Sequence, residues 1–430
     1  MDTATRAGSK VLAVRGTRPG TLPAVTTPPR RPADPRAVRS YPDDLEAALV
    51  ARAHARAPRS TPTEAVDRLW RAASTLSELF TTARPEQFPD YAADEDLRLA
   101  YGLYFAPQTW VRARFPLAEA VEARGWRPPG DRPLRILDLG AGIGTAGWSV
   151  AQWCIARELA PSAEILAVDR SRAALAAMED LWSLGGSAVR GIRLETRVGD
   201  FSEAAAAPDA SRPRHDVIVL SFALNEAFPP GDDAGASAFL IALKDRLAPG
   251  GLLLVIEPAL RETATRLRTL AAPLVASETY RVLAPDLDGR IGPPPSDARF
   301  FDHEVRRWRP PASLRTLNRR LRRSLDELTF SFLALSPEAA PPFPPSPRRT
   351  RLTSPLARLK GRLACTGMDA DGARSTYDLL ERHLTEDDRR RVLRAERGDH
   401  VVFSTLEPLR EPAWFRVPLP DAFQVAWHPD

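Results

Sequence analysis

The spacing of apolar residues changes twice along the 430-residue chain. Over residues 41–130, apolar residues recur every three to four positions, which predicts a helical domain. Over residues 131–336, short apolar segments alternate with amphipathic helical stretches, and this predicts an α/β domain with a mostly parallel, seven-stranded sheet covered on both faces. Over residues 351–430, shorter strand-like segments around one helical stretch predict a small C-terminal domain of α+β or β structure.

Three segments lack such periodicity. Residues 1–40 are rich in Pro, Thr, Ala and Arg, and they are expected to form a disordered, basic leader. Residues 337–350 form a Pro-rich linker that should be extended. Residues 286–326 separate the last two expected strands as a basic insertion.

Several features of the sequence indicate where in the cell the protein is located. No run of 18 apolar residues occurs, so no membrane contact is expected. The first residues lack the apolar block of a secretory signal, and the chain has only two cysteines, Cys154 and Cys365. A cytoplasmic location is therefore expected, with a mitochondrial one as the alternative because the leader bears arginine and few acids.

The stretch ILDLGAGIGTAG, residues 136–147, joins the first expected strand to a helix. It contains the dinucleotide-type spacing Gly142-x-Gly144-x-x-Gly147, but Asp138 precedes the glycines. A carboxylate there would repel a pyrophosphate and suits a ligand with an ammonium or sulfonium group. Gly147 is better explained as part of the first turn of a helix that lies close to the sheet.

Two further acids end the next strands. Asp169 ends the second strand, 25 residues after Gly144, where a carboxylate can accept hydrogen bonds from both hydroxyls of a ribose. Asp200 ends the third strand, where a carboxylate can accept from the amine of an adenine. Because ligands of such sheets lie beyond the carboxyl ends of the strands, both acids should face one site.

Through LDLGAGIG, AVD and VGDF, in this order, residues 134–258 resemble the class I S-adenosylmethionine-dependent methyltransferases. The resemblance implies a Rossmann-like sheet and S-adenosylmethionine as the cofactor. It places the glycines and Asp138 at the methionine and ribose part, Asp169 at the ribose, and Asp200 and Phe201 at the adenine. A degenerate fold that no longer transfers methyl groups is the alternative. The cofactor-binding residues expected are Asp138, Gly140, Ala141, Gly142, Gly144, Asp169, Arg170, Asp200, Phe201 and Ser221.

The acceptor side carries less information. The fourth strand is followed by NEAFPP, residues 225–230, which does not match the Asp/Asn-Pro-Pro-aromatic order of enzymes that methylate exocyclic base nitrogens. Neither cysteine is placed to attack a cytosine. Glu226 and Glu257 are the nearest acids, but each is equally well explained by capping the following helix, so the catalytic residue is left unknown.

Over residues 95–405 the chain also resembles the methyltransferase-like proteins associated with small-ribosomal-subunit assembly in bacteria and mitochondria. The matching stretches include LNEAF, VIEPALRET, FDHEVRRWRPP and SPLARLKGRLACTGMDADG. Members of that family often have cysteines that are associated with an iron–sulfur cluster, whereas this chain has none from Pro285 to Trp308. No iron–sulfur cluster is therefore expected, because such clusters need thiolates. No other metal is expected on Asp302, His303 and Glu304, since adjacent residues rarely converge on one ion.

The positive charge is concentrated in arginine. The net charge is +5, and two acid-free basic runs occupy residues 305–323 and 348–362. Together with the family resemblance, they predict contact with small-subunit rRNA or its precursor particle, although like-charge runs are often only solvated faces. A small-molecule methyltransferase with a helical lid and a catalytically silent RNA-binding scaffold are the alternatives. The RNA-binding residues expected are Arg306, Arg307, Arg309, Arg315, Arg319, Arg320, Arg322, Arg323, Arg348, Arg349, Arg351, Arg358 and Lys360.

Overall fold

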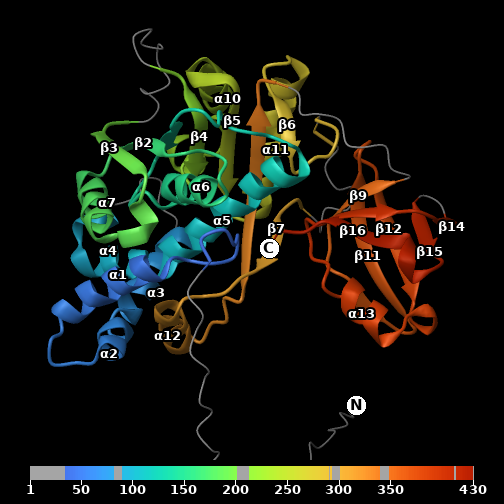
Figure 1. Ribbon diagram of the computed structural model, residues 1–430, viewed down its shortest axis with the longest axis horizontal. Coiled ribbons are helices and arrows are strands. Elements are labelled where there is room, and N and C mark those ends of the chain that lie inside the picture. The colour runs from blue at the N-terminus through green and yellow to red at the C-terminus, as the bar shows by residue number, and fades with distance from the viewer. Residues whose placement is uncertain are drawn as a thin grey trace, which may run out of the picture. The chain divides into compact units, whose positions relative to one another are not determined.

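The structure is a computed structural model of the chain (Figure 1). It describes residues 34–81, 90–200, 213–289, 291–292, 301–338, 348–410 and 413–429. Most of the expected leader, Phe201 and most of the expected Pro-rich linker lie outside the described residues.

Helices precede the first strand, as their apolar spacing predicts. Thr61 begins the second helix with a capping box to Glu64, and the Asp94 side chain accepts from the amide of Leu97 at the start of the fourth. The stretch expected as one helix after Thr61 is interrupted at Arg68–Leu69. The helices are α1 (Asp43–Ala55), α2 (Pro62–Asp67), α3 (Trp70–Thr81), α4 (Glu95–Ala100) and α5 (Ala106–Ala118), with the 3-10 turn η1 (Tyr91–Ala93) and the π-helical turns η2 (Tyr101–Phe105) and η3 (Glu119–Ala123).

A mixed sheet follows, and it confirms the α/β class. Its path is β3-β2-β1-β4-β5-β8-β6, and β7 pairs with β8 beside this path. The neighbours from β3 to β5 are parallel, whereas β8 is antiparallel to β5, β6 and β7. The sheet has eight strands and not the expected seven, because part of the expected insertion forms β7. The strands are β1 (Leu134–Leu139), β2 (Ala163–Asp169), β3 (Ile192–Val198), β4 (His215–Ser221), β5 (Leu247–Glu257), β6 (Arg281–Ala284), β7 (Glu304–Arg307) and β8 (Glu327–Ser336).

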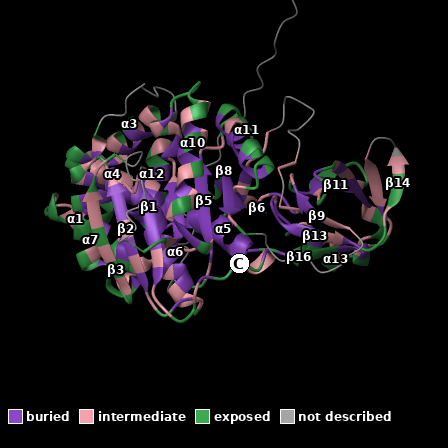
Figure 2. Cartoon of the chain, turned by 90° about the horizontal axis from the view of Figure 1, so that it is seen from above, coloured by how far each residue is buried: buried purple, intermediate pink, exposed green. Residues whose placement is uncertain are grey.

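Helices cover both faces of this sheet, so its central strands are buried on both sides (Figure 2). In β1, Ile136 belongs to the core cluster shared with α5 and α6, and its neighbour Leu137 belongs to the cluster shared with α10 and α11. This explains why the strand is apolar throughout. The later helices are α6 (Thr145–Ala156), α7 (Arg172–Leu184), α9 (Leu224–Ala227), α10 (Asp233–Leu243), α11 (Arg261–Ala276) and α12 (Ala312–Leu321), with the 3-10 turns η4 (Gly186–Val189) and η5 (Lys244–Arg246).

The C-terminal residues form a second sheet with its own core. The strand order is β14-β15-β12-β11-β9-β13-β16, and β10 pairs with β11. Tyr377 and Phe403 stack at 4.2 Å between ring centroids in this core, so it does not depend on the first sheet for its apolar contacts. Its elements are β9 (Arg349–Leu352), β10 (Ala357–Leu359), β11 (Arg362–Asp369), β12 (Arg374–Leu380), η6 (Glu381–His383), α13 (Glu386–Val392), β13 (His400–Phe403), β14 (Glu407–Arg410), β15 (Trp414–Val417), η7 (Pro420–Ala422) and β16 (Phe423–Trp427).

Candidate cofactor-binding site

The glycine-rich loop between β1 and α6 is a tight left-handed turn. Gly140, Gly142 and Gly144 have φ angles of +67°, +56° and +75°, a region that L side chains rarely adopt. The amides of Gly140 and Ala141 donate to the carbonyl of Val168 at 2.9 and 3.1 Å, so the loop is held against the end of β2. A Cβ on Gly144 would collide with the Met178 side chain of α7. The loop therefore brings bare backbone to the carboxyl edge of the sheet, at the point where strand order reverses between β1 and β4.

Asp169 ties this loop to the next helix. Its Oδ2 accepts from the amide of Gly142 at 2.7 Å, and its Oδ1 accepts from the amide of Ser171 at 2.8 Å. Burial raises the pKa of Asp169, and the two backbone hydrogen bonds oppose that shift. An ionised carboxylate has more acceptor sites than these two amides use, so it can also receive hydroxyl groups of a ligand.

Asp138 lies beneath the loop and is 1% exposed. Its Oδ2 accepts from the amide of Gly147 at 2.8 Å. Burial, together with the charge of Asp169, raises the pKa of Asp138 to about 7. A Cβ on Gly147 would lie 2.6 Å from that Oδ2, which confirms that Gly147 permits α6 to lie close to the sheet. Asp138 thus holds the start of α6 and places under the loop a carboxyl group that pairs with no cation of the described residues.

The other expected cofactor residues stand at the same edge. The amide of Gly199 donates to the carbonyl of Asp169 at 3.0 Å, so the exposed Asp200 follows directly beside the end of β2. Arg170 is exposed, and its charge opposes the raised pKa of Asp169. The hydroxyl of Ser221, at the end of β4, is buried and has no hydrogen-bond partner within the described ranges.

A group of stacked aromatic side chains, which the sequence analysis did not single out, covers the loop. Tyr91 and Tyr101 stack with 5.2 Å between ring centroids, and Tyr101 stacks with Phe105 at 5.8 Å. Phe80 meets all three rings edge-on. We call these four residues the aromatic stack. The hydroxyl of Tyr91 lies 3.9 Å from the position that a Cβ on Gly142 would take. The spacing of Tyr101 and Phe105, four residues apart on a helix, was the available signal.

The segment after β4 is held by a buried acid. Oε1 of Glu257 accepts from the amides of Leu224 and Asn225 at 3.0 and 3.4 Å, and its Oε2 accepts from Asn225 Nδ2 at 2.8 Å. Glu257 is 1% exposed, so it positions the start of α9. Of the two acids considered as a catalytic base, Glu226 is the exposed one. Burial and, to a smaller extent, the charge of Glu226 raise the pKa of the Tyr91 and Tyr101 phenols.

Two of the arginines expected to bind RNA are buried, which contradicts that role for them. Arg306 is 1% exposed and pairs with Glu304 and Asp399 at 3.1 and 2.7 Å. Arg351 is 4% exposed and pairs with Glu119 and Glu304. Sequence spacing could not reveal this, because Asp399, which pairs with Arg306, and Glu119, which pairs with Arg351, lie in distant segments. Trp308, in the same basic run, is also buried.

The remaining basic residues are paired with an acid, half-buried, or exposed without a carboxylate partner. Within the described ranges, an acid pairs with each of Arg307, Arg320, Arg348 and Arg358. Arg349 is half-buried, and burial lowers its pKa. The exposed cations that have no carboxylate within 4.0 Å in the described part of the chain are Arg309, Arg315, Arg319, Arg322, Arg323 and Lys360.

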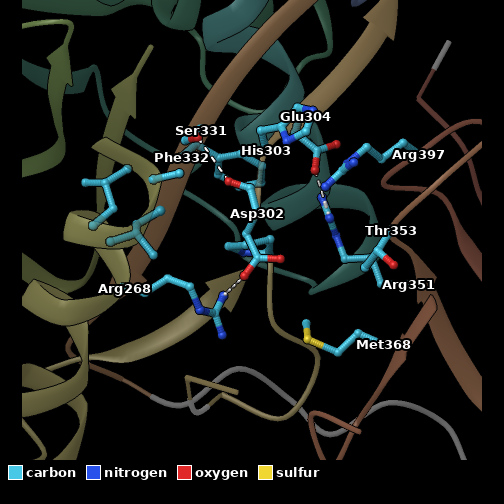
Figure 3. Close-up of a pocket in the computed structure, with 14 residues that line it drawn as sticks. Arg268, Asp302, His303, Glu304, Ser331, Phe332, Arg351, Thr353, Met368 and Arg397 are labelled. Atoms are coloured by element: carbon cyan, nitrogen blue, oxygen red, sulfur yellow. Dashed lines mark hydrogen bonds and ion pairs between the residues drawn. The ribbon is translucent and has the colours of Figure 1, made fainter. Parts of the chain in front are cut away.

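A charged pocket lies between α11, β8 and the C-terminal sheet (Figure 3). Asp302 contacts Arg268 and Arg374 at 3.2 and 2.7 Å, and Glu304 turns instead to Arg351. The ring of His303 stacks on Phe301 and hydrogen-bonds its carbonyl at 3.0 Å. The three adjacent residues considered for a metal thus engage three separate sets of partners. Over the described ranges, no three His, Cys, Asp or Glu side chains are grouped as metal ligands.

Two further observations concern the cysteines and the length of the helices. Cys154 and Cys365 are both buried, and burial raises the pKa of each thiol to about 12, which makes neither a ready nucleophile. None of the helices in the described part of the chain is long and apolar enough to cross a membrane.

The sequence matches no protein-family model and no curated protein. Among solved structures, the chain is similar to a precorrin-6y C5,15-methyltransferase from Geobacter metallireducens, with 14% identity over 53% of this chain and 86% of that chain, at a TM-score of 0.27. It is similar to a SAM-dependent methyltransferase from Agrobacterium tumefaciens, with 18% identity over 38% and 49%, also at 0.27. The C-terminal domain of the Rhodobacter capsulatus precorrin-6Y enzyme matches with 18% identity over 37% and 68%, at 0.25. With TM-scores this low, these similarities assign no activity, which has to be inferred from the residues of the site.

Proposed function

We propose that the protein binds S-adenosylmethionine at the glycine-rich loop and acts as a methyltransferase or methyltransferase-like protein. The observation that carries this proposal is the pair of acids that bracket the loop. Asp169 hydrogen-bonds the amide of Gly142, and Asp138 lies buried beneath with its pKa raised to about 7. A buried carboxylate without a cation suits a ligand that brings a positive charge.

The residues present fit that cofactor. The loop glycines leave backbone exposed where a Cβ would block a ligand, and Asp169 retains acceptor capacity for ribose hydroxyls. Asp200 stands beside it for an adenine amine. When bound, the cofactor would supply an activated methyl group. The chain contributes by holding the cofactor and by covering it with the aromatic stack, since methyl transfer needs mainly positioning.

Thermal unfolding with S-adenosylmethionine and S-adenosylhomocysteine tests this proposal. Ligand that binds the native state raises the midpoint, by an amount equivalent to about 2.7 kcal/mol at a hundredfold excess over Kd. The control is NAD, because the loop also contains dinucleotide spacing. No shift with either S-adenosyl compound, or a larger shift with NAD, would contradict the proposal.

We further propose that helix α12 contacts small-subunit rRNA. Three exposed arginines of this helix and its C-terminal cap, Arg315, Arg319 and Arg322, have no carboxylate within 4.0 Å in the described part of the chain. Arg322 adopts the left-handed conformation that ends the helix, with φ of +52°. Guanidinium groups that are not paired within the protein are available for phosphates. This support is independent of the cofactor site.

RNA binding measured against salt concentration tests the α12 proposal. The triple variant Arg315→Gln, Arg319→Gln, Arg322→Gln should reduce the slope of log affinity against log salt by about 2, because up to three phosphate contacts are removed. The matched control replaces Arg389, Arg390 and Arg391 of α13, each of which pairs with an acid three residues earlier. Equal losses in both triples, or no RNA binding by the wild type, would overturn it in favour of a small-molecule acceptor. A small-subunit rRNA transcript and a size-matched unrelated RNA should also differ in affinity.

A further inference from the structure

Arg112 of α5 is half-buried, and its surroundings differ from those of the nearby buried Arg114. Its guanidinium lies 5.4 Å from the centre of the Phe222 ring, and its Nη2 donates to Gln108 Oε1 at 3.1 Å. Its Nε is enclosed without a hydrogen-bond partner, and no carboxylate of the described residues lies within ion-pair distance. Two residues later, Arg114 shows the contrast, because its Nε bonds the hydroxyl of Ser149 and its Nη1 bonds the carbonyl of Ala37.

The charge of Arg112 is therefore poorly compensated. Burial lowers the pKa of Arg112 to about 10, and the phenols of Tyr101 and Tyr104 oppose this only in part. Even partial removal of a cation from water costs free energy when no counter-ion is present. An anionic group of a ligand near Arg112 would remove that cost. Binding of such a ligand would therefore stabilise the folded protein.

The location of Arg112 identifies which ligand group it would meet. Phe222, under the guanidinium, directly follows β4 and has a φ of +61°, with its amide bonded to the carbonyl of Ile256 at 2.7 Å. Tyr101, on the other side, belongs to the aromatic stack over Gly142. Its pKa is raised by burial and also by the charges of Asp169 and Asp138. Arg112 thus lies between the stack and the end of β4, at the edge of the sheet where the glycine-rich loop lies.

The site then has two groups of opposite charge, and neither has an ion-pair partner among the described residues. Asp138 supplies a negative charge beneath the loop, and Arg112 supplies a positive one near the end of β4. A ligand that carries both a cationic centre and a carboxylate complements this arrangement, and the methionine part of S-adenosylmethionine carries both. A purely anionic ligand would be attracted by Arg112 and repelled by Asp138.

We infer that Arg112 binds the carboxylate of the cofactor's methionine part. This inference rests on the proposed function, and it names a residue of α5, outside the glycine-rich loop and the strand ends, as part of the site. A planar guanidinium can bind a carboxylate through two parallel hydrogen bonds, for which the neighbouring Gln108 amide holds one nitrogen in place.

Two ligands that differ only in the amino-acid part test the inference by calorimetry. S-adenosylhomocysteine carries the carboxylate, whereas 5′-methylthioadenosine lacks the whole amino-acid part. Arg112→Gln should weaken S-adenosylhomocysteine at least about tenfold and change 5′-methylthioadenosine less than about twofold, because only the first ligand loses a charge-assisted hydrogen bond. Arg112→Lys should give an intermediate loss, and the exposed Arg190→Gln is the control that changes neither affinity.

Thermal unfolding of the ligand-free variants supplies a second readout. Arg112→Gln removes an uncompensated charge, so its unfolding midpoint should equal or exceed that of the wild type. Unchanged binding of S-adenosylhomocysteine, or equal weakening of both ligands, would overturn the inference. A wild type that binds neither ligand would instead overturn the proposed function.

Discussion

Arg351 and Glu119, 232 residues apart, form a two-pronged ion pair that joins the C-terminal sheet to the end of helix α5. Arg351 Nε donates to Glu119 Oε1 at 2.7 Å, and its Nη2 donates to Oε2 at 2.8 Å. His400 shares the same carboxylate at 2.9 Å from Oε1. All three residues are buried, so this contact between the C-terminal sheet and the end of α5 depends on charges removed from water.

The first prediction concerns Glu119→Gln. Loss of the carboxylate leaves the buried Arg351 without its bidentate partner, although Glu304 remains at 2.9 Å. Breaking one partner of a buried pair typically costs about 3–5 kcal/mol, and the remaining ion pair should place this variant near the lower figure. The free energy of unfolding in urea measures it. The exposed pair Arg36–Glu158 provides the control, since Glu158→Gln should cost about 1 kcal/mol or less.

A second prediction concerns acid. Burial lowers the pKa of His400 below 6.5, so the unfolded chain takes up that proton first and stability falls as pH drops below 6.5. Burial would raise the pKa of Glu119, but Arg351 and His400 lower it to about 2. The stability that the Glu119 carboxylate contributes is therefore present above pH 4.5 and is lost as pH falls toward 2. Denaturation at pH 7.5, 5.5 and 4.0 should show this decline. His400→Gln should flatten the part between pH 6.5 and 4.5, and an unchanged profile would contradict the assignment.

The third prediction concerns Asp138→Asn. Asparagine can still accept from the amide of Gly147, so helix α6 should keep its start, and removing a carboxylate whose pKa is raised should not lower stability at pH 8. Affinity for S-adenosylmethionine should fall about tenfold. Affinity for S-adenosylhomocysteine should fall less, because that ligand lacks the sulfonium charge. In the wild type, affinity should also fall as pH drops below about 7, when Asp138 becomes protonated. Binding titrations of the wild type and Asp138→Asn with S-adenosylmethionine from pH 6 to 8 test this prediction. Wild-type affinity that does not change with pH would contradict the role of the Asp138 charge.

The fourth prediction compares two glycines. A Cβ on Gly147 would meet Asp138 at 2.6 Å, whereas a Cβ on Gly130 would meet nothing within 4 Å. Gly147→Ala should therefore lower the free energy of unfolding by about 1–3 kcal/mol, even though alanine favours helices more than glycine does. Gly130→Ala should change it by no more than about 0.5 kcal/mol. Similar stability of the two variants, measured in urea, would contradict the close approach of α6 to β1.

Local patterns in the sequence determined the α/β class and the chemistry at the strand ends. The apolar runs around Ile136 and Val168 predicted strands, and the glycine-rich stretch after the first strand predicted a ligand site before α6, because both properties depend on neighbouring residues. The acids Asp138 and Asp169 could be assigned to one edge of the sheet because each ends a parallel strand.

Tertiary structure alone decided which of these charges are available. Arg306 and Arg351 stand in basic runs yet are buried against acids from other segments, and Glu257 is engaged by the amides of α9. Arg112 lies in an ordinary helical stretch, yet its Nε is enclosed and no acid in the described part of the chain pairs with it. Burial and ion pairing arise between residues that are tens to hundreds of positions apart. The sequence by itself therefore determined where charged groups occur, and the packing determined which of them can meet a ligand.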